Sequence, residues 1–394
     1  MNKQPVDVSV SELTELLSSY LDSGPSINYA FKIVGHPGVG KSSIVRQIAE
    51  KKRFLFMDTR LAFKENIDLG GYPVPDHSKN RMIYFRPKFI PPEQVPEGYQ
   101  GILWFLDEAN RAHPTVIQTL FQIITERMCG EHALPKETAI VLAGNLGEED
   151  HTMITDFDDS ALDGRLAIFH LKPSAESWLS WASQSGIHPA IISYITLFPE
   201  KIWDEIHIHP NPRGWHQVSQ ALILSYGIRT VEQLANTLLE NKHSSVEKLV
   251  MSLIGETVSS DFLSQVTAPR EISSAQVLGG DPGALARVKT GDLPSEDLLW
   301  AVTGAIQNIR DQRIRCHEAD TESLLFPLGN LLRFIGFSRT DTRFSFFYLL
   351  LKECGVFTLI PPALKTLESP EEIKELFNRF SDIVNPSEAH GSVE

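Results

Sequence analysis

The sequence has few cysteines and no long apolar run, and each shortage excludes a class of protein. Its three cysteines, Cys129, Cys316 and Cys354, stand far apart, with no CxxC pair among them. This spacing argues against a structural zinc site or a disulfide framework and fits a reducing cytosol. No apolar run reaches the roughly 18 residues that a membrane span needs, so we expect no transmembrane helix.

Positive charge is also scarce. The chain carries 36 Lys and Arg against 50 Asp and Glu, a formal net charge of −14. Affinity for nucleic acid comes mainly from clustered Lys and Arg, so this balance disfavours general nucleic-acid binding, although it permits a local basic loop. The first residues, MNKQPVDVSVSELTELL, lack the basic and then apolar regions of a secretory signal. A cytoplasmic protein is therefore predicted.

What the sequence does contain is an alternation of apolar strands and helices, followed by helices alone. The strand-like runs lie at residues 29–34, 54–58, 102–106, 139–143 and 166–171. Because they are nearly continuous in apolar residues and alternate with helical patterns, they predict a parallel five-stranded α/β sheet with helices on both faces. After Pro173 the strand signals fade, and helical spacing continues almost to the last residues.

These patterns divide the chain into predicted parts. They are an N-terminal helix in 1–25, an α/β nucleotide-binding core in 26–172, an α-helical lid in 173–270, and a helical C-terminal region of unassigned role in 271–394. The core contains a proline-rich insertion at about 70–98, which is too long for a mere connector. Residues 129–135 predict a second, shorter projecting hairpin.

A phosphate-binding loop is the most specific motif. Gly35-x-x-x-x-Gly40-Lys41-Ser42 follows an apolar strand and opens a helix, which is the context that such a loop requires. Glycines let successive N–H groups turn toward phosphate oxygens, and the helix start adds its positive dipole end. The predicted nucleotide-binding residues are Gly35, His36, Pro37, Gly38, Val39, Gly40, Lys41, Ser42 and Ser43. Lys41 would reach the β- and γ-phosphates.

Two acids end the apolar strand of GILWFLDE. A buried strand delivers Asp107 and Glu108 to its C-terminal end, where ligands of α/β proteins bind. Asp107 and the Ser42 hydroxyl are predicted to hold Mg²⁺, and Glu108 to act as general base on the attacking water. An apolar strand followed by two acids is common by itself; the phosphate-binding loop upstream makes the site interpretation strong.

Three further polar residues are candidates. Asn145 ends the next strand and could orient the water, or could simply form a turn. Arg165, after Asp163-Gly164, could reach the γ-phosphate of a neighbouring subunit, or could be a surface arginine paired with Asp163 or Asp159. Arg213 opens a helix after Pro212 and could sense the γ-phosphate, or could make a structural contact only.

Taken in order, GHPGVGKS, LWFLDEANRAHP, LAGN, ALDGR and NPRGW resemble the motifs of an AAA+ ATPase of the MoxR family. The resemblance covers roughly residues 26–270, and the insertion falls where that family carries its helix-2 insert. By this likeness Lys41 and Ser42 belong to Walker A and Asp107 and Glu108 to Walker B. Asn145 matches sensor 1, Arg165 the arginine finger and Arg213 sensor 2.

The resemblance implies an ATP- and Mg²⁺-dependent ATPase that works as a homo-oligomeric ring, a hexamer, on a protein partner. For this family that partner is often a von Willebrand A domain protein. One departure affects the finger: the usual DRF ending is here Gly164-Arg165-Leu166, so Arg111 and Arg127 are alternatives. Whether Arg213 acts on its own or a neighbouring subunit is open at this point.

Two other functions are compatible with the motifs. The first is a DNA-directed AAA+ motor of restriction, defence or phage replication, for which a basic pore would be expected; Arg81, Arg86 and Lys88 lie in the insertion. The second is a scaffold that binds ATP but hydrolyses it negligibly. The intact Glu108 argues against the scaffold.

Overall fold

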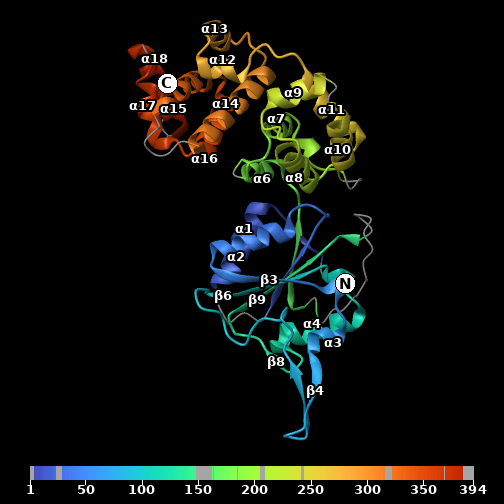
Figure 1. Ribbon diagram of the computed structural model, residues 1–394. Helices are drawn as coiled ribbons and strands as arrows, with labels where there is room; N and C mark the ends of the chain where they lie inside the picture. Colours follow the sequence, from blue (N-terminus) through green and yellow to red (C-terminus); the bar gives the residue numbers. More distant parts are fainter. Residues whose placement is uncertain are drawn as a thin grey trace. The chain divides into compact units, whose positions relative to one another are not determined.

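The chain divides into two compact units (Figure 1). A computed structural model describes residues 4–23, 29–147, 162, 164–183, 185–204, 209–240, 244–315, 322–367 and 369–384. The first unit comprises Met1–Ser177 together with Trp203–Arg213, and the second comprises Trp178–Ile202 together with Gly214–Glu394. The predicted boundary between a lid and a C-terminal region at residue 270 stays a prediction.

A parallel sheet forms the centre of the first unit. Its strands are β1 (Val6–Val8), β2 (Ala30–Val34), β3 (Phe54–Arg60), β6 (Gly101–Asp107), β9 (Thr138–Gly144) and β10 (Leu166–Leu171). They are arranged in the order β1-β10-β2-β9-β6-β3, and every pairing is parallel. The predicted α/β fold class is confirmed. The short edge strand β1, which the sequence did not predict, adds a sixth strand to the expected five.

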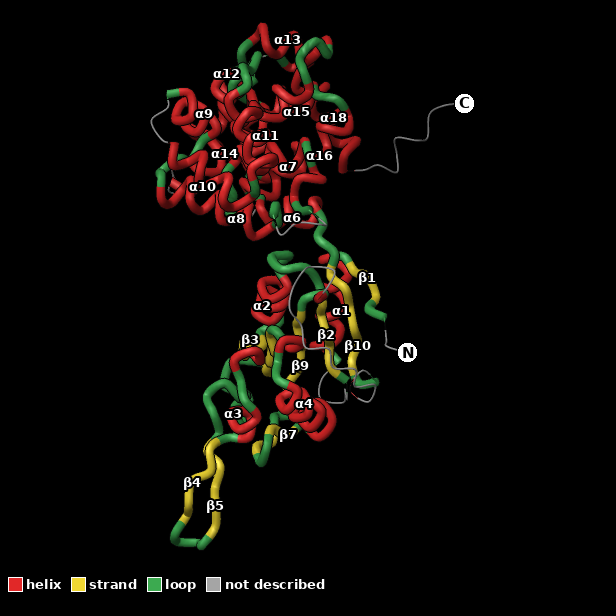
Figure 2. Tube along the Cα trace, turned by 90° about the vertical axis from the view of Figure 1, so that its right-hand side faces the viewer, coloured by secondary structure: helices red, strands yellow, loops and turns green. Residues whose placement is uncertain are grey.

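Helices cover both faces of the sheet (Figures 1 and 2). α1 (Val10–Asp22) and α2 (Lys41–Lys51) pack on one face, where buried Leu13, Leu17 and Ile48 join the core that includes Ile33 and Phe105. α4 (Pro114–Glu126) packs on the other face, against a core that contains Trp104 and Ile140. The odd and even residues of β6 therefore contribute to different cores, as both faces of a covered strand must.

The register of the three central strands brings their C-terminal ends together. Val34 at the end of β2 pairs with Gly144 at the end of β9, and Leu106 of β6 pairs with Leu142 of β9. The residues that follow these strands therefore meet at one edge of the sheet.

The insertion forms a projecting structure at the end of the first unit (Figure 2). It contains β4 (Tyr72–Asp76) and β5 (Arg81–Phe85), which form an antiparallel hairpin, and α3 (Asn66–Gly70) leads into it. The predicted second hairpin is present as β7 (Met128–Cys129) and β8 (His132–Ala133). The two parts contact each other, because the Cys129 thiol donates to Leu69 O at 3.0 Å and Arg86 Nη2 donates to Ala133 O at 3.1 Å. Short 3-10 helices lie at Leu61–Phe63 and Ala109–Arg111.

Described residues of the second unit fold into helices. They are α6 (Ala175–Ala182, which begins in the first unit), α7 (Pro189–Leu197), α8 (Pro212–Gln220, which also begins there), α9 (Val231–Leu239), α10 (Ser244–Ile254), α11 (Glu256–Thr267), α12 (Ser274–Gly279), α13 (Pro282–Thr290), α14 (Ser295–Arg315), α15 (Glu322–Phe337), α16 (Thr340–Cys354), α17 (Ile360–Leu364) and α18 (Pro370–Val384), with 3-10 turns at Pro199–Ile202 and Phe357–Leu359 and a π-helix at Ala221–Ser225. Apolar residues from α12 to α18 share one core, and α7 packs against α14. In the described ranges, none of the helices is both long and apolar enough to cross a membrane.

Gly101, the first residue of β6, offers a test of how tightly the sheet packs around the strand that ends in Asp107. A Cβ at this position would lie 2.5 Å from both Glu137 O and Phe54 Cε1. Gly101→Ala should therefore lower the free energy of unfolding of the first unit by about 1–3 kcal/mol. A denaturant titration measures the change. Gly70→Ala is the matched control, because a Cβ there meets nothing within 4 Å; equal stability of the two variants would contradict the packing argument.

Candidate nucleotide site

The candidate site begins with the loop between β2 and α2. Gly38 and Gly40 have φ values of +85° and +97°, which side-chain-bearing residues rarely adopt. Gly40 is the N-cap of α2 and provides no side-chain acceptor, so the first N–H groups of this helix lack a side-chain cap. Such groups, together with the positive end of the helix dipole, form a suitable site for a phosphate.

Lys41 lies at the centre of this loop. Its Nζ donates to Gly35 O at 2.5 Å, to His36 O at 3.1 Å and to Asn145 Oδ1 at 3.1 Å. The ammonium group is therefore held by neutral oxygens at the place where the sequence predicts phosphate. The structure also brings Asn145, the predicted sensor 1, into direct contact with the loop lysine 104 positions away.

Asp107 and Glu108 follow β6 at the same edge of the sheet. The Glu108 N–H donates to Asp107 Oδ1 at 2.9 Å, and Glu108 adopts left-handed backbone angles of φ 53° and ψ 37°. A residue with a side chain pays for this conformation in strain, which folded proteins retain mainly at functional sites. Glu108 Oε2 lies 3.8 Å from Arg111 Nη1, so the predicted base has a cation beside it in its own chain.

Asp58 on the neighbouring strand β3 shares this acidic environment. Its carboxyl pKa is raised above the ordinary value by burial and by the negative charge of Asp107, and Arg46 Nη2 lies 4.0 Å away. A divalent cation bound by Asp107 would relieve that repulsion. The Ser42 hydroxyl and the Asp107 carboxylate fit Mg²⁺, which takes few protein oxygens and keeps waters and phosphate oxygens as its other ligands.

Asn110 is a residue that sequence reasoning missed. Its Nδ2 donates to Asn145 O at 2.6 Å, and its Oδ1 accepts from Asn145 N at 3.2 Å. These two hydrogen bonds fix the backbone of Asn145 and hence the direction of its side chain toward Lys41. A Cβ on Gly144 would lie 2.7 Å from Asn110 Oδ1, so the glycine leaves the room that the Asn110 amide needs. The available signal was the Asn in DEANRA together with the glycine of LAGN.

The segment Trp203–Arg213 belongs to the first unit, and its described residues at both ends lie against the loop. The Trp203 ring lies 4.6 Å from the His36 ring in an edge-on arrangement. A Cβ on Gly38 would lie 2.8 Å from Asn211 Oδ1 and 3.3 Å from Arg213 Cβ. Arg213, the predicted sensor 2, therefore starts its exposed side chain beside the phosphate-binding loop of its own chain.

Arg165 lies at the opposite end of the strands, where β10 and β2 begin. It immediately precedes β10, whose first residue, Leu166, pairs with Ala30 at the beginning of β2, and its carbonyl accepts from Ala30 N at 3.0 Å. The phosphate-binding loop follows the other end of β2, about 15 Å away at roughly 3.3 Å per residue. The Arg165 guanidinium stacks over Phe121 at 4.7 Å from the ring centroid. Asp159 and Asp163, the acids considered as its partners, lie outside the described residues.

The alternative arginines have partners in their own chain. Arg111 lies beside Glu108, and Arg127 Nη2 donates to Thr138 O at 2.7 Å. The structure thus gathers the loop, Asp107, Glu108, Asn145 and Arg213 at one edge of the sheet, and it keeps Arg165 apart from them.

Comparison with known proteins adds little to this geometry. No protein-family model matches the chain, and no curated protein matches it. Among solved structures, the chain is similar to the crystal structure of NtrX from Brucella abortus, with 16% sequence identity and a TM-score of 0.31. The alignment covers 80% of this chain and 67% of that one. A likeness this distant carries no argument about function.

The role of Asn110 can be tested by stability. Asn110→Ala removes both bonds to the Asn145 backbone, so the free energy of unfolding should fall by about 1–3 kcal/mol. Hydrogen exchange at the Asn145 amide should accelerate in the same variant. Gln118→Ala, which removes an exposed amide nearby, should change stability by no more than about 0.5 kcal/mol. An Asn145 amide that stays as protected as in the parent chain would rule out the positioning role.

Proposed function

We propose that this chain is an AAA+ ATPase resembling the MoxR family, which hydrolyses ATP in a ring-shaped homo-oligomer to remodel or activate a protein partner. The observation that carries the proposal is the convergence of Lys41, Asn145, Asp107 and Glu108 at the shared C-terminal edge of β2, β9 and β6. A phosphate cradle, a magnesium carboxylate, a base and a water-orienting amide are the parts that phosphoryl transfer to water requires.

In the proposed hydrolysis of ATP, each side chain of the site has one role. Lys41 exchanges its carbonyl and amide partners for the β- and γ-phosphate oxygens, which bind an ammonium more strongly because they are charged. Glu108 takes a proton from water as the water oxygen bonds to the γ-phosphorus and the bond to the β–γ bridging oxygen breaks. ADP and phosphate leave. Ser42 and Asp107 would hold Mg²⁺, which would neutralise charge on the phosphate oxygens.

The two arginines are proposed to act from different chains. The contact of Arg213 with Gly38 supports sensing of the γ-phosphate in the same subunit. Arg165 lies at the far edge of its own sheet, which supports action on the nucleotide of a neighbouring subunit. A site of this kind is complete only in an assembly, so we propose a hexameric ring, as the resemblance implies. A von Willebrand A domain protein is the partner class that the same resemblance suggests.

A DNA-directed motor remains the alternative function, but the insertion gives it little support. The guanidinium of Arg86 donates to Pro91 O and Ala133 O, with Glu93 at 3.8 Å. Arg81 Nε lies 3.9 Å from Asp76. These two basic groups are therefore partly neutralised by their own surroundings, and the chain as a whole is acidic. ATP turnover that rises on addition of duplex or single-stranded DNA would favour the alternative.

Glu108→Gln tests the proposed base. The variant should keep its affinity for ATP and lose hydrolysis by about 10²- to 10⁴-fold, because the amide cannot take the proton. Nucleotide binding is measured by calorimetry and turnover by phosphate release. Glu97→Gln, which alters an exposed carboxylate in the insertion, should hydrolyse ATP at the parent rate. Undiminished turnover in Glu108→Gln would refute the assignment.

Arg165 is tested by mixing subunits. Arg165→Ala should leave ATP affinity nearly unchanged and lower turnover of the assembled protein by about 10³-fold or more. Lys41→Ala subunits have a defective loop but an intact Arg165, so mixing the two variants should restore part of the turnover.

Phe121→Leu provides the matched control for that experiment. It removes the ring beneath the Arg165 guanidinium but keeps the arginine. The variant should retain turnover if Arg165 acts on nucleotide. Absence of rescue in verified mixed assemblies, or equal losses in Phe121→Leu and Arg165→Ala, would show that the arginine serves packing instead.

A further inference from the structure

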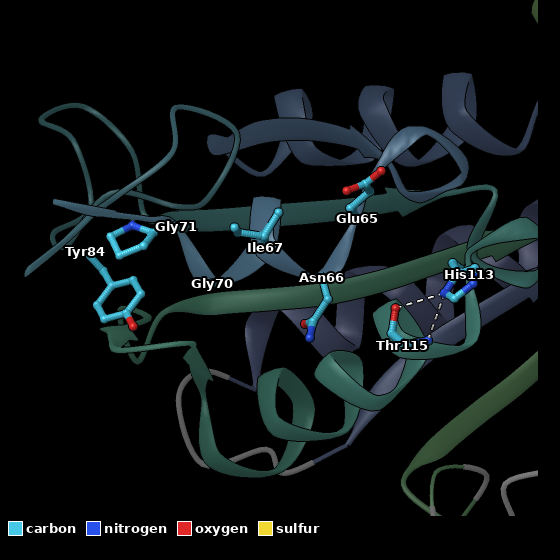
Figure 3. A pocket seen from close by; sticks show the side chains of 9 residues that line it. Glu65, Asn66, Ile67, Gly70, Gly71, Tyr84, His113 and Thr115 are labelled. Carbon is cyan, nitrogen blue, oxygen red and sulfur yellow. Dashed lines mark hydrogen bonds between the residues drawn. The ribbon is translucent and has the colours of Figure 1, made fainter. Parts of the chain in front are cut away.

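A groove of about 650 Å³ lies at the base of the projecting hairpin (Figure 3). It is formed by α3, by the β4–β5 hairpin and by the beginning of α4. Tyr84 lies at one end, Ile67 between the ends, and Glu65 and His113 at the other end. The groove therefore has an apolar end and a polar end, and none of the residues predicted to bind nucleotide lines it.

The hairpin has one closed edge and one open edge. Proline has no N–H, so Pro73 and Pro75 fit in β4 only where the N–H position points away from the partner strand. Prolines on an outward edge prevent another strand from pairing there. The β4 edge of the hairpin is closed in this way.

The β5 edge is open. Pro73 pairs with Tyr84 and Pro75 with Met82, so the N–H and C=O groups of Met82 and Tyr84 also point outward, on the other side of the hairpin. Over the described parts of the chain, β5 pairs with β4 alone, and no further backbone bond reaches these groups. The strand sequence RMIYF contains no proline that would block pairing.

Side chains around this edge are apolar and exposed. Met82 is 50% exposed and Phe85 is 60% exposed, and Ile67 at the groove is 47% exposed. Met82 and Tyr84 lie on the same face of the hairpin, since they are two residues apart in a strand. A strand added beside β5 would place alternate side chains on that face, next to the apolar end of the groove.

The charge of the side chains that line the groove indicates the charge of the molecule that binds there. Glu65 is the acidic residue in its lining, and Asp68 follows one turn later on α3. Arg86, which directly follows β5, directs its guanidinium to the carbonyl oxygens of Pro91 and Ala133. The polar end of the groove is thus complementary to a basic side chain.

We propose that the outer edge of β5 and the adjoining groove bind an extended segment of a protein partner by strand addition. The segment carries apolar residues at alternate positions and a Lys or Arg that reaches Glu65. Backbone bonds to Met82 and Tyr84 supply affinity, and the groove supplies selectivity. The inference rests on the proposed function in one respect, namely that the ATPase acts on a protein.

In the test, peptides are selected for binding to the full chain that carries the Glu108→Gln substitution. A phage library of random linear peptides is the probe, and the enriched sequence is synthesised with a fluorescein label for affinity measurement. The expected consensus alternates apolar residues and contains Lys or Arg. On peptide binding, the amides of Met82 and Tyr84 should become protected from hydrogen exchange.

Met82→Pro tests the backbone hydrogen bonds of the β5 edge separately from its side chains. It removes one outward N–H and leaves the pairing of β4 with β5 intact, because that N–H does not face β4. Peptide affinity should fall by about tenfold or more, which is the effect of losing roughly 1.4 kcal/mol. Met82→Ala trims the same side chain but keeps the N–H and should bind more tightly than the proline variant. Retained protection of the Ile83 amide verifies that the hairpin has folded. Glu65→Lys should weaken only peptides that contain the basic residue.

Other outcomes overturn the proposal. Equal affinity of Met82→Pro and Met82→Ala would exclude strand addition, and a library without enrichment would exclude the peptide site. Labelled single-stranded DNA that displaces the peptide would assign the surface to nucleic acid. Loss of self-association in Met82→Pro would assign the edge to a second copy of this chain. ATP turnover is measured in parallel on the parent chain, which keeps Glu108: turnover without peptide binding refutes this inference alone, and peptide binding without turnover refutes the ATPase proposal alone.

Discussion

The position of β9 between β2 and β6 is the constraint on which the candidate site depends. Parallel pairing of these three strands makes their C-terminal ends coincide, so three short sequence motifs that lie far apart in the chain meet in space. The bond from Lys41 Nζ to Asn145 Oδ1 then joins the first motif to the last. The Asn110 amide completes the connection, since it holds the Asn145 backbone from the 3-10 helix Ala109–Arg111, which lies between the acids and α4. A shift of one residue in this register would separate all of these groups.

Much of this arrangement could be predicted from the sequence. The central strands are buried on both faces, so they read as continuous apolar runs, and the predicted run at 29–34 differs from β2 (Ala30–Val34) by one residue. The loop glycines and Lys41 have a spacing that follows from how a backbone surrounds phosphate. β1 could not be predicted in the same way, because three residues, of which only Val8 is buried, give no periodic pattern.

The contacts that sequence reasoning missed join distant residues through single side chains. Nothing in the spacing of Asn110 shows that its amide bonds both backbone groups of Asn145, because that depends on the separation of β6 and β9. The packing of Asn211 and Arg213 against Gly38 was also invisible, since the helical pattern around them predicts a place in the lid. In the structure, Trp203–Arg213 is part of the first unit, together with the loop.

The sheet also separates the two proposed arginines in space. Arg213 starts from the edge that holds the phosphate loop, and Arg165 starts from the opposite edge, at the beginning of β10. If both act on a γ-phosphate, the two arginines cannot use the same one, because β2 lies lengthwise between them. One copy must then present its Arg165 edge to the loop edge of the next. Such an interface joins two different surfaces, and repeated contacts of this type close into a ring when the rotation between copies permits it. The length of β2 thus supports the proposed ring in addition to the motifs.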